Sequence, residues 1–147
     1  MLFLHRKLPL GEFSEGIGHG EESVRIAEAV DHPFSLVEAY RGIGYLYLRK
    51  GDLHRAIPVL ERGLSLCRVA AIPMWSSWFT PALGYAYTLS GQVTEGMALF
   101  EQGASMGMTF WRQLYWFLVL SEAYLLAGRL EDATHQDRQA LDLARAL

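Results

Sequence analysis

Four glycines divide this chain into units of nearly constant length. They are Gly11, Gly51, Gly91 and Gly128, and the intervals between them are 40, 40 and 37 residues. Each glycine separates two segments in which apolar residues recur at helical spacing, so each marks the expected end of one helix and the start of the next. A fixed period of this length is typical of proteins built from stacked helical repeats.

The helix after each glycine repeats one pattern of small residues. The fifth and twelfth positions after the glycines are Gly16 and Ser23, Ala56 and Gly63, Gly96 and Gly103, and Ala133 and Ala140. Seven residues are about two helical turns, so the two small residues of each pair share a face. A face of this kind predicts close packing of a neighbouring helix, at the roughly 8–10 Å that separates packed helix axes. An apolar stripe runs beside it, and in the second unit this stripe ends at Cys67.

The helix before each of the last three glycines ends in a common string. The strings are IGYLY at 43–47, LGYAY at 83–87 and LSEAY at 120–124. Each contains an apolar residue, a small residue and, four residues before the glycine, a tyrosine. We expect that tyrosine to lie against the following helix and to supply a large apolar contact.

These strings resemble the tetratricopeptide repeat family, which has L-G-x-x-Y on the first helix of a pair and a small residue on the second. Ala56, Gly96 and Ala133 stand at that small position. The resemblance covers about residues 34–147, and the helix expected at 12–30 matches a second helix alone. The units are longer than the family's roughly 34 residues. In this they are similar to repeats attached to bacterial signalling ATPases and nucleotide cyclases.

The resulting expectation is an all-α protein with about seven helices, a right-handed α-solenoid of antiparallel helix pairs that forms a single domain over residues 1–147. The helices are expected at 12–30, 35–50, 53–70, 76–90, 93–107, 110–127 and 130–146. Three helix starts carry further expectations. A capping box of Ser35 and Glu38 begins the second helix, and Asp52 can cap the third. If the fourth helix starts later than residue 76, Thr80 caps it and Pro81 is its first residue.

Composition and charge exclude several classes of function. The net charge of −3 and the pI near 5.9 argue against nucleic-acid binding, which requires a basic surface. The single cysteine cannot form an internal disulfide, which favours a cytoplasmic location. The most apolar window, residues 114–120, is shorter than the roughly 20 residues of a membrane span. No membrane association is therefore expected.

The sequence offers no group of residues suited to catalysis. No two histidines are three or four residues apart, so no helix face presents a pair of metal ligands. The glycine-rich string GIGHGEES at 16–23 lacks the lysine, directly followed by serine or threonine, that closes a phosphate-binding loop. Cys67 lies on the apolar stripe and is expected in the core. We expect neither an enzyme nor a bound metal or cofactor.

The family resemblance implies a concave groove lined by the first helix of each pair. Carried over residue by residue, this surface includes Glu38, Arg41, Tyr45, Arg49, Trp78, Tyr85, Tyr115 and Glu122. Tryptophan, tyrosine and arginine dominate binding energies when they are desolvated. The first hypothesis is therefore a protein-interaction scaffold that binds a peptide or a partner domain in this groove.

A second hypothesis is an oligomerisation or regulatory segment of a larger signalling ATPase, cyclase or transcription regulator. Only ten residues precede Gly11, and they are too few to form a full partner helix for the helix expected at 12–30. A repeat buries its apolar face only against its neighbours, so this helix favours a homodimer formed through the terminal helices.

Overall fold

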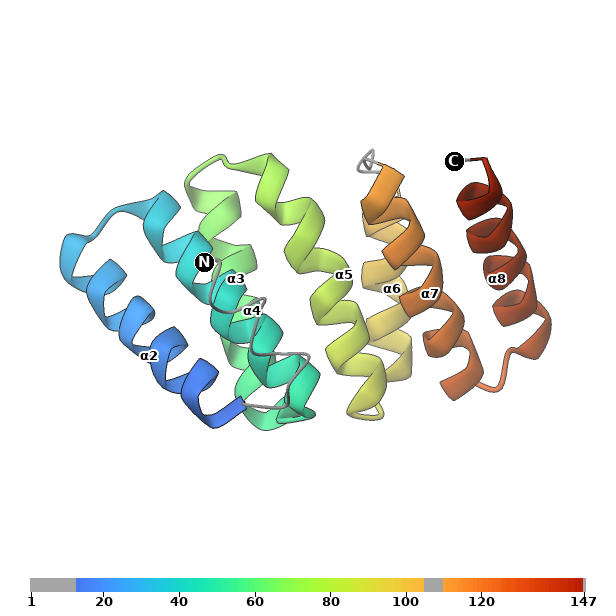
Figure 1. Ribbon diagram of the computed structural model, residues 1–147, viewed down its shortest axis with the longest axis horizontal. Coiled ribbons are helices and arrows are strands. Elements are labelled where there is room, and N and C mark those ends of the chain that lie inside the picture. The colour runs from blue at the N-terminus through green and yellow to red at the C-terminus, as the bar shows by residue number, and fades with distance from the viewer. Residues whose placement is uncertain (1–12, 105–109, 147) are drawn as a thin grey trace. The chain divides into compact units, whose positions relative to one another are not determined.

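The computed structural model describes residues 13–104 and 110–146, and these residues form seven α-helices and no strand. The helices are α2 (Phe13–Val30), α3 (Pro33–Lys50), α4 (Leu53–Val69), α5 (Pro73–Leu89), α6 (Val93–Ala104), α7 (Phe110–Leu126) and α8 (Leu130–Arg145) (Figure 1). The predicted all-α class and the helix number are confirmed for this part of the chain. Most observed bounds lie within three residues of those expected from the glycine period.

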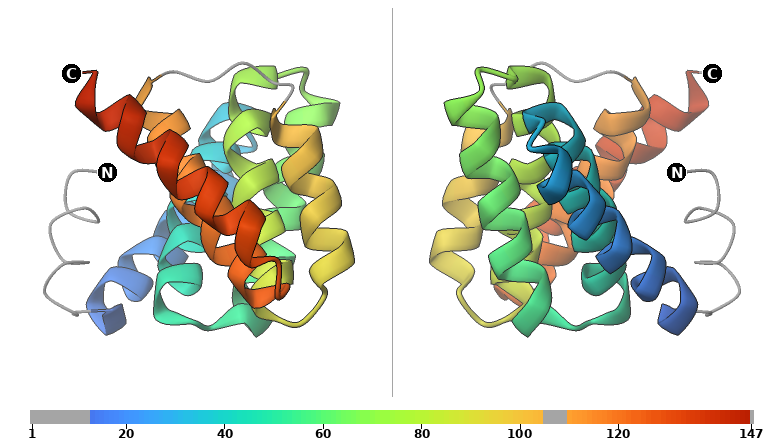
Figure 2. Two further views of the ribbon diagram at one scale, coloured as in Figure 1. Left: turned by 90° about the vertical axis from the view of Figure 1, so that its right-hand side faces the viewer. Right: turned by 90° about the vertical axis from the view of Figure 1, so that its left-hand side faces the viewer.

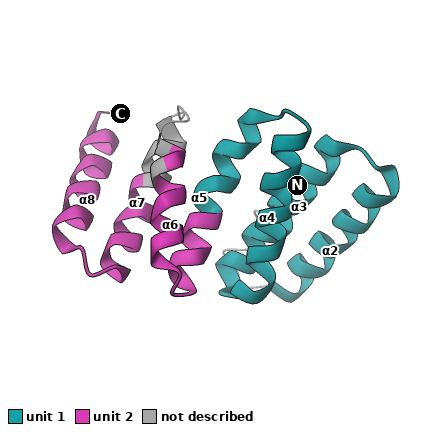
Figure 3. Cartoon of the chain, turned by 180° about the vertical axis from the view of Figure 1, so that it is seen from behind, with its two compact units in different colours: residues 1–82 teal, residues 83–147 magenta. Residues whose placement is uncertain are grey.

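The chain separates into two compact units, residues 1–82 and 83–147 (Figure 3). In the first unit α3 packs against both α2 and α4, and in the second unit α7 packs against both α6 and α8. Within each unit, helices joined by a short turn run antiparallel (Figure 2). The antiparallel hairpins are therefore as expected. A single domain and a right-handed superhelix stay predictions.

Three of the four periodic glycines end a helix in the left-handed conformation. The φ angles of Gly51, Gly91 and Gly128 are 78°, 88° and 71°. The N–H of the residue after each glycine donates to the carbonyl of the repeated tyrosine, at distances of 2.9, 2.9 and 2.8 Å for Tyr47, Tyr87 and Tyr124. This pairing satisfies carbonyl groups that a helix end otherwise leaves open. Gly11 lies outside the described residues.

The turn between α4 and α5 has the same closure without a glycine. Ala71 has a φ of 54°, and the N–H of Ile72 donates to the carbonyl of Cys67 at 2.9 Å. An alanine in this conformation is strained, because its Cβ crowds the backbone. The turn is therefore formed by the same hydrogen bonds as the glycine turns, at a higher conformational energy.

Two expected helix starts are wrong, and the third is right only in its position. Helix α3 begins at Pro33, which is tolerated at a first helical position, so Ser35 lies inside the helix and forms no capping box. Helix α5 likewise begins at Pro73, which places Thr80 and Pro81 in its interior. Asp52 does precede α4, but its carboxylate accepts a hydrogen bond from Arg55 Nε at 2.9 Å and does not cap the helix.

The small residues lie where helices approach most closely. A Cβ added at Gly63 would overlap the ring of Phe79, and one added at Gly96 would overlap the Thr88 hydroxyl and come within 2.6 Å of the carbonyl oxygen of Gly84. Of the eight small positions, all are buried except Ser23, which is exposed. Seven positions are therefore buried as the prediction requires, close contact with a neighbouring helix is shown at Gly16, Gly63 and Gly96, and the prediction is wrong for Ser23.

Each unit has its own core. In the first unit the largest fully buried apolar side chains are Phe79, Ile43, Leu46, Leu60, Val37 and Cys67. Burial raises the pKa of the Cys67 thiol, and the prediction that this residue belongs to the core is confirmed. In the second unit the buried cluster consists of Phe100, Val119, Leu120 and Ala123, with Phe117 and Tyr124 packed against it.

Two tyrosines of α3 tie α2, α3 and α4 together. The Tyr47 hydroxyl donates to Glu21 of α2 at 2.8 Å, and the guanidinium of Arg55 of α4 lies 4.9 Å from the Tyr47 ring centre. Arg55 also pairs with Glu21 at 3.2 Å. The predicted contact of this tyrosine with the following helix is thus present, and Arg55 contributes to it.

Tyr40 lies seven residues before Tyr47 on α3 and makes the equivalent contacts, with residues seven positions after Glu21 on α2 and after Arg55 on α4. Its hydroxyl donates to Glu28 of α2 at 3.4 Å, and the charge of Arg62 of α4 acts on it. Burial is the main cause that raises the pKa of both Tyr40 and Tyr47, and the neighbouring glutamates add to the effect.

Gly63→Ala should lower the free energy of unfolding by about 1–3 kcal/mol, because the added methyl group overpacks the contact with Phe79. The matched control is Gly18→Ala on α2, where no atom lies within 4 Å of an added Cβ. This control should stabilise the protein by about 0.5–1 kcal/mol through helix propensity alone. Urea unfolding measures both. Equal effects of the two substitutions would show that the predicted close contact is absent.

Ala71→Gly should raise the free energy of unfolding by up to about 1 kcal/mol, because glycine adopts the left-handed conformation without strain. Gly51→Ala makes the reverse change in the same type of turn and should destabilise by about the same amount. Thermal unfolding followed by circular dichroism compares the two. A loss of stability in Ala71→Gly would contradict the assigned turn.

Alkaline pH should destabilise the protein in part through Tyr40 and Tyr47. Their folded-state pKa values are raised above the ordinary value of about 10, so above that pH the unfolded chain loses protons that the folded chain keeps. Stability from this source is present below pH 10 and is lost as the pH rises. Urea titrations between about pH 9 and 11 should give a shallower loss for the Tyr40→Phe, Tyr47→Phe double variant than for the unmodified protein. Identical slopes would contradict the expectation.

Candidate partner-binding site

Four of the eight predicted site residues come together in the first unit. Glu38, Arg41 and Tyr45 lie on α3 at intervals of three and four residues, which places them on one face of the helix. Trp78 lies on α5, three residues after Trp75. Together with Trp75, which is not among the predicted residues, these four residues form what we call the Arg41 cluster: Glu38, Arg41, Tyr45, Trp75 and Trp78.

The guanidinium of Arg41 is the centre of the cluster. Its central carbon lies 5.0 Å from the ring centre of Trp75 and 5.7 Å from that of Trp78. A cation this close to two indole faces is attracted to both, by about 0.5–1 kcal/mol at an exposed site and more when water is excluded. Arg41 therefore holds α3 against the first half of α5.

The charge of Arg41 is neutralised within the cluster. Its Nη2 lies 3.0 Å from Glu38 Oε2, and the two side chains are 13% and 22% exposed. A largely buried charge needs a partner of this kind, because its transfer from water is unfavourable. The cluster consequently presents aromatic surface with little net charge.

The aromatic rings lead from the core of the unit to its surface. Phe79 is fully buried and contacts Trp78 edge to face at 5.1 Å, and the half-buried Trp78 contacts the half-buried Tyr45 at 6.3 Å. Phe34, which is 45% exposed, contacts Trp75 at 6.1 Å. The surface rings are thus held in fixed positions by the ones beneath them.

Sequence reasoning missed the part played by Phe34 and Trp75. Phe34 directly follows Pro33, but no repeated string marks it, and only the position of α3 over α5 reveals the contact. The indole N–H of Trp75 is buried and has no hydrogen-bond acceptor among the residues that the structure describes. An unsatisfied donor of this type is unfavourable, by about 1–3 kcal/mol.

The other predicted residues do not belong to the Arg41 cluster. In the second unit the Tyr85 hydroxyl donates to Glu122 Oε2 at 2.6 Å and links α5 to α7. Arg49 is exposed near the end of α3, about two turns beyond Arg41. Tyr115 lies in α7, and its side chain is outside the described part of the structure.

Other kinds of site were sought in residues 13–104 and 110–146. No three His, Cys, Asp or Glu side chains in these ranges are placed to hold a metal ion. No helix there combines the length and the apolar character that crossing a membrane requires. The glycine-rich string at 16–23 lies inside α2 and is helical.

Comparison with known proteins agrees with the helical-repeat fold. The tetratricopeptide repeat family model matches residues 37–69, most of the α3–α4 hairpin. The chain is similar to the crystal structure of a Podosopora anserina protein described as a kinesin light chain with nearly identical TPR-like repeats. The TM-score is 0.77 and the identity 21%, over 99% of this chain and 74% of that one. The crystal structure of a variant of that protein gives a TM-score of 0.77 and 20% identity over 98% and 72%. No curated protein sequence matches.

The matched segment contains the features that first suggested the family. Gly44, Tyr47 and Ala56 all lie within it, and Gly51 forms its turn. At identities of 20–21% the solved structures establish the fold alone. Helical repeats of this type generally act as scaffolds for protein–protein interaction. The chain therefore has a TPR-like helical-repeat fold, and its residues 37–69 match the tetratricopeptide repeat model.

Proposed function

We propose that this protein is an interaction scaffold that binds a peptide or a helix of a partner protein at the Arg41 cluster. The observation that carries the proposal is the pair of half-buried rings, Tyr45 and Trp78, supported by buried aromatic residues and by Arg41. Tyrosine, tryptophan and arginine are the residue types most enriched among those that dominate interface energies.

The rigidity of the cluster favours binding. Association is opposed by the ordering of side chains, at about 0.5–1.5 kcal/mol for each side chain that becomes fixed. Trp78 is held between Phe79, Tyr45 and Arg41 before any partner arrives, so little further order is required.

The chemistry of the cluster favours an apolar partner segment. The ion pair of Arg41 with Glu38 leaves no uncompensated charge to attract an acidic or a basic peptide. An amphipathic helix or an extended segment with aromatic or aliphatic anchors fits such a surface. A non-catalytic role agrees with the fold. The contributions of Arg49, Tyr85, Tyr115 and Glu122, the cytoplasmic location and the alternative role in a larger signalling protein stay predictions.

Peptide display on the folded protein tests this proposal. Peptides selected on the unmodified protein should bind the Tyr45→Ala variant at least about tenfold more weakly, because truncation of a central aromatic residue typically removes about 1–2 kcal/mol or more of binding energy. Fluorescence anisotropy measures the dissociation constants. Circular dichroism establishes that the variant is folded.

The matched control is His54→Ala, since His54 is exposed on α4 and does not belong to the cluster. Peptide affinity for this variant should be unchanged. Selected peptides that bind the Tyr45→Ala variant as tightly as the unmodified protein would refute the proposed site, and so would a selection that enriches no peptide.

A further inference from the structure

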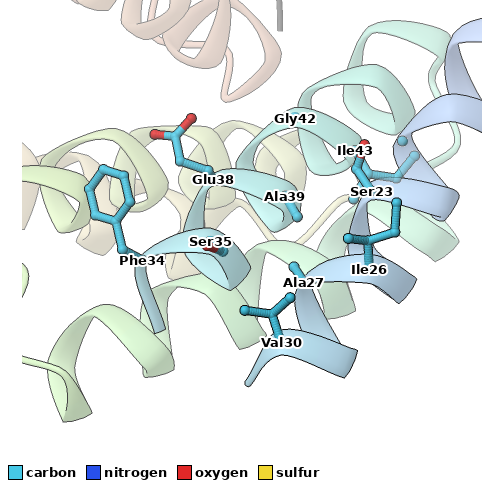
Figure 4. A pocket seen from close by; sticks show the side chains of 11 residues that line it. Ser23, Ile26, Ala27, Val30, Phe34, Ser35, Glu38, Ala39, Gly42 and Ile43 are labelled. Atoms are coloured by element: carbon cyan, nitrogen blue, oxygen red, sulfur yellow. The ribbon is translucent and has the colours of Figure 1, made fainter. Parts of the chain in front are cut away.

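A separate apolar groove of about 430 Å³ lies between α2 and α3 in the first unit. Its lining includes the small residues Gly20, Ala27, Ala39 and Gly42 and the larger Ile26, Val30 and Phe34. Figure 4 shows Ile26 and Val30 on one helix and Phe34 and Glu38 on the other. The groove meets the Arg41 cluster at Glu38, on its rim.

The repeat period identifies what such a groove holds. A shift of 40 residues carries Ser35, Glu38 and Ala39 onto Trp75, Trp78 and Phe79 of α5. In that following repeat the equivalent surface is covered by a helix, because Phe34, Arg41 and Tyr45 of α3 all contact Trp75 or Trp78. The groove between α2 and α3 is therefore the seat of a helix that the described residues do not supply.

Large apolar side chains are exposed along this seat. Ile26, Val30 and Phe34 are 52%, 63% and 45% exposed. Ile26 and Val30 are one turn apart on α2 and form a ridge, and the small, exposed Ser23 of the same helix lies beside them in the groove lining. Helix α2 thus carries an apolar ridge, Ile26 and Val30, and also forms one side of a groove that could accept such a ridge from another helix.

We infer that the occupant is α2 of a second copy of this chain, which forms a two-fold symmetric dimer. A two-fold axis places the same patch on both sides of an interface, which suits a surface that is complementary to itself. An axis perpendicular to α2 makes the two α2 helices antiparallel. Consecutive helices of the hairpins are also antiparallel, so the incoming helix has the direction that the repeat requires (Figure 2).

The charges near the seat permit this pairing. On α2, Glu22 accepts a hydrogen bond from Arg25 Nε at 2.8 Å, and on the rim Glu38 pairs with Arg41 at 3.0 Å. Two other acids of α2 are engaged elsewhere, since Glu21 binds Tyr47 and Glu28 binds Tyr40. Glu22 and Glu38, the acids beside Ile26, Val30 and Phe34, therefore meet an incoming helix as ion pairs, and Glu28 is directed toward Tyr40 of α3.

Sedimentation equilibrium of the full chain tests the inference. The unmodified protein should form dimers at micromolar concentrations, and Val30→Glu should raise the dimer dissociation constant at least about tenfold. Val69→Glu is the matched control, because Val69 is 82% exposed at the end of α4, outside the groove. It should leave the dimer unchanged. Since Val30 is itself exposed, circular dichroism should show that both variants are folded.

An unmodified protein that stays monomeric at several hundred micromolar would overturn the inference. This holds even if a helix of another protein occupies the groove. A dimer that Val30→Glu and Val69→Glu weaken equally would overturn it as well. Peptide binding at the Arg41 cluster should survive Val30→Glu, because Val30 does not belong to that cluster. The failure of the dimer and the failure of the proposed peptide site are therefore distinguishable.

Discussion

Two contacts between helices of this protein depend on the absence of a side chain. The ring of Phe79 occupies the space that a Cβ of Gly63 would fill, and in the second unit Gly96 approaches Thr88 and the carbonyl of Gly84 in the same way. The candidate site depends on the first of these contacts. The contact of Phe79 with Gly63 fixes the first half of α5 against α4, and this places the neighbouring Trp75 and Trp78 beside Arg41 of α3. A larger residue at Gly63 would displace the helix that carries both indoles.

Much of the fold could be predicted because it depends on short-range rules. Gly51, Gly91 and Gly128 end helices through a backbone conformation that glycine adopts easily, so their spacing located the hairpins. The helix starts were harder to predict. Pro33 and Pro73 are each followed within a few residues by polar side chains that could cap a helix. The sequence does not show whether the helix begins at the proline or after the polar residue. Ser23 differs for another reason: it faces the groove beside α3, where no described helix covers it.

The candidate site was only partly visible in the sequence. The family resemblance placed Glu38, Arg41, Tyr45 and Trp78 on one expected surface, and these residues do meet. It did not reveal that Arg41 lies over two indole rings, or that Phe34 contacts Trp75, because both depend on how far α3 is rotated over α5. The contacts of Tyr40 and Tyr47 with glutamates of α2 were missed because they depend on how α3 is rotated against α2. Contacts between helices that are far apart in the sequence follow from packing, which periodicity does not specify.

A double-mutant cycle between Gly63→Ala and Phe79→Leu tests the central contact most directly. If the ring of Phe79 occupies the space beside Gly63, the shorter and more flexible leucine side chain should accept the added methyl group. The double variant should then be more stable than the sum of the single effects predicts, by about 1 kcal/mol or more in urea unfolding. Effects that add within about 0.3–0.5 kcal/mol would show that the two residues do not interact, and would contradict this account of how the helices pack.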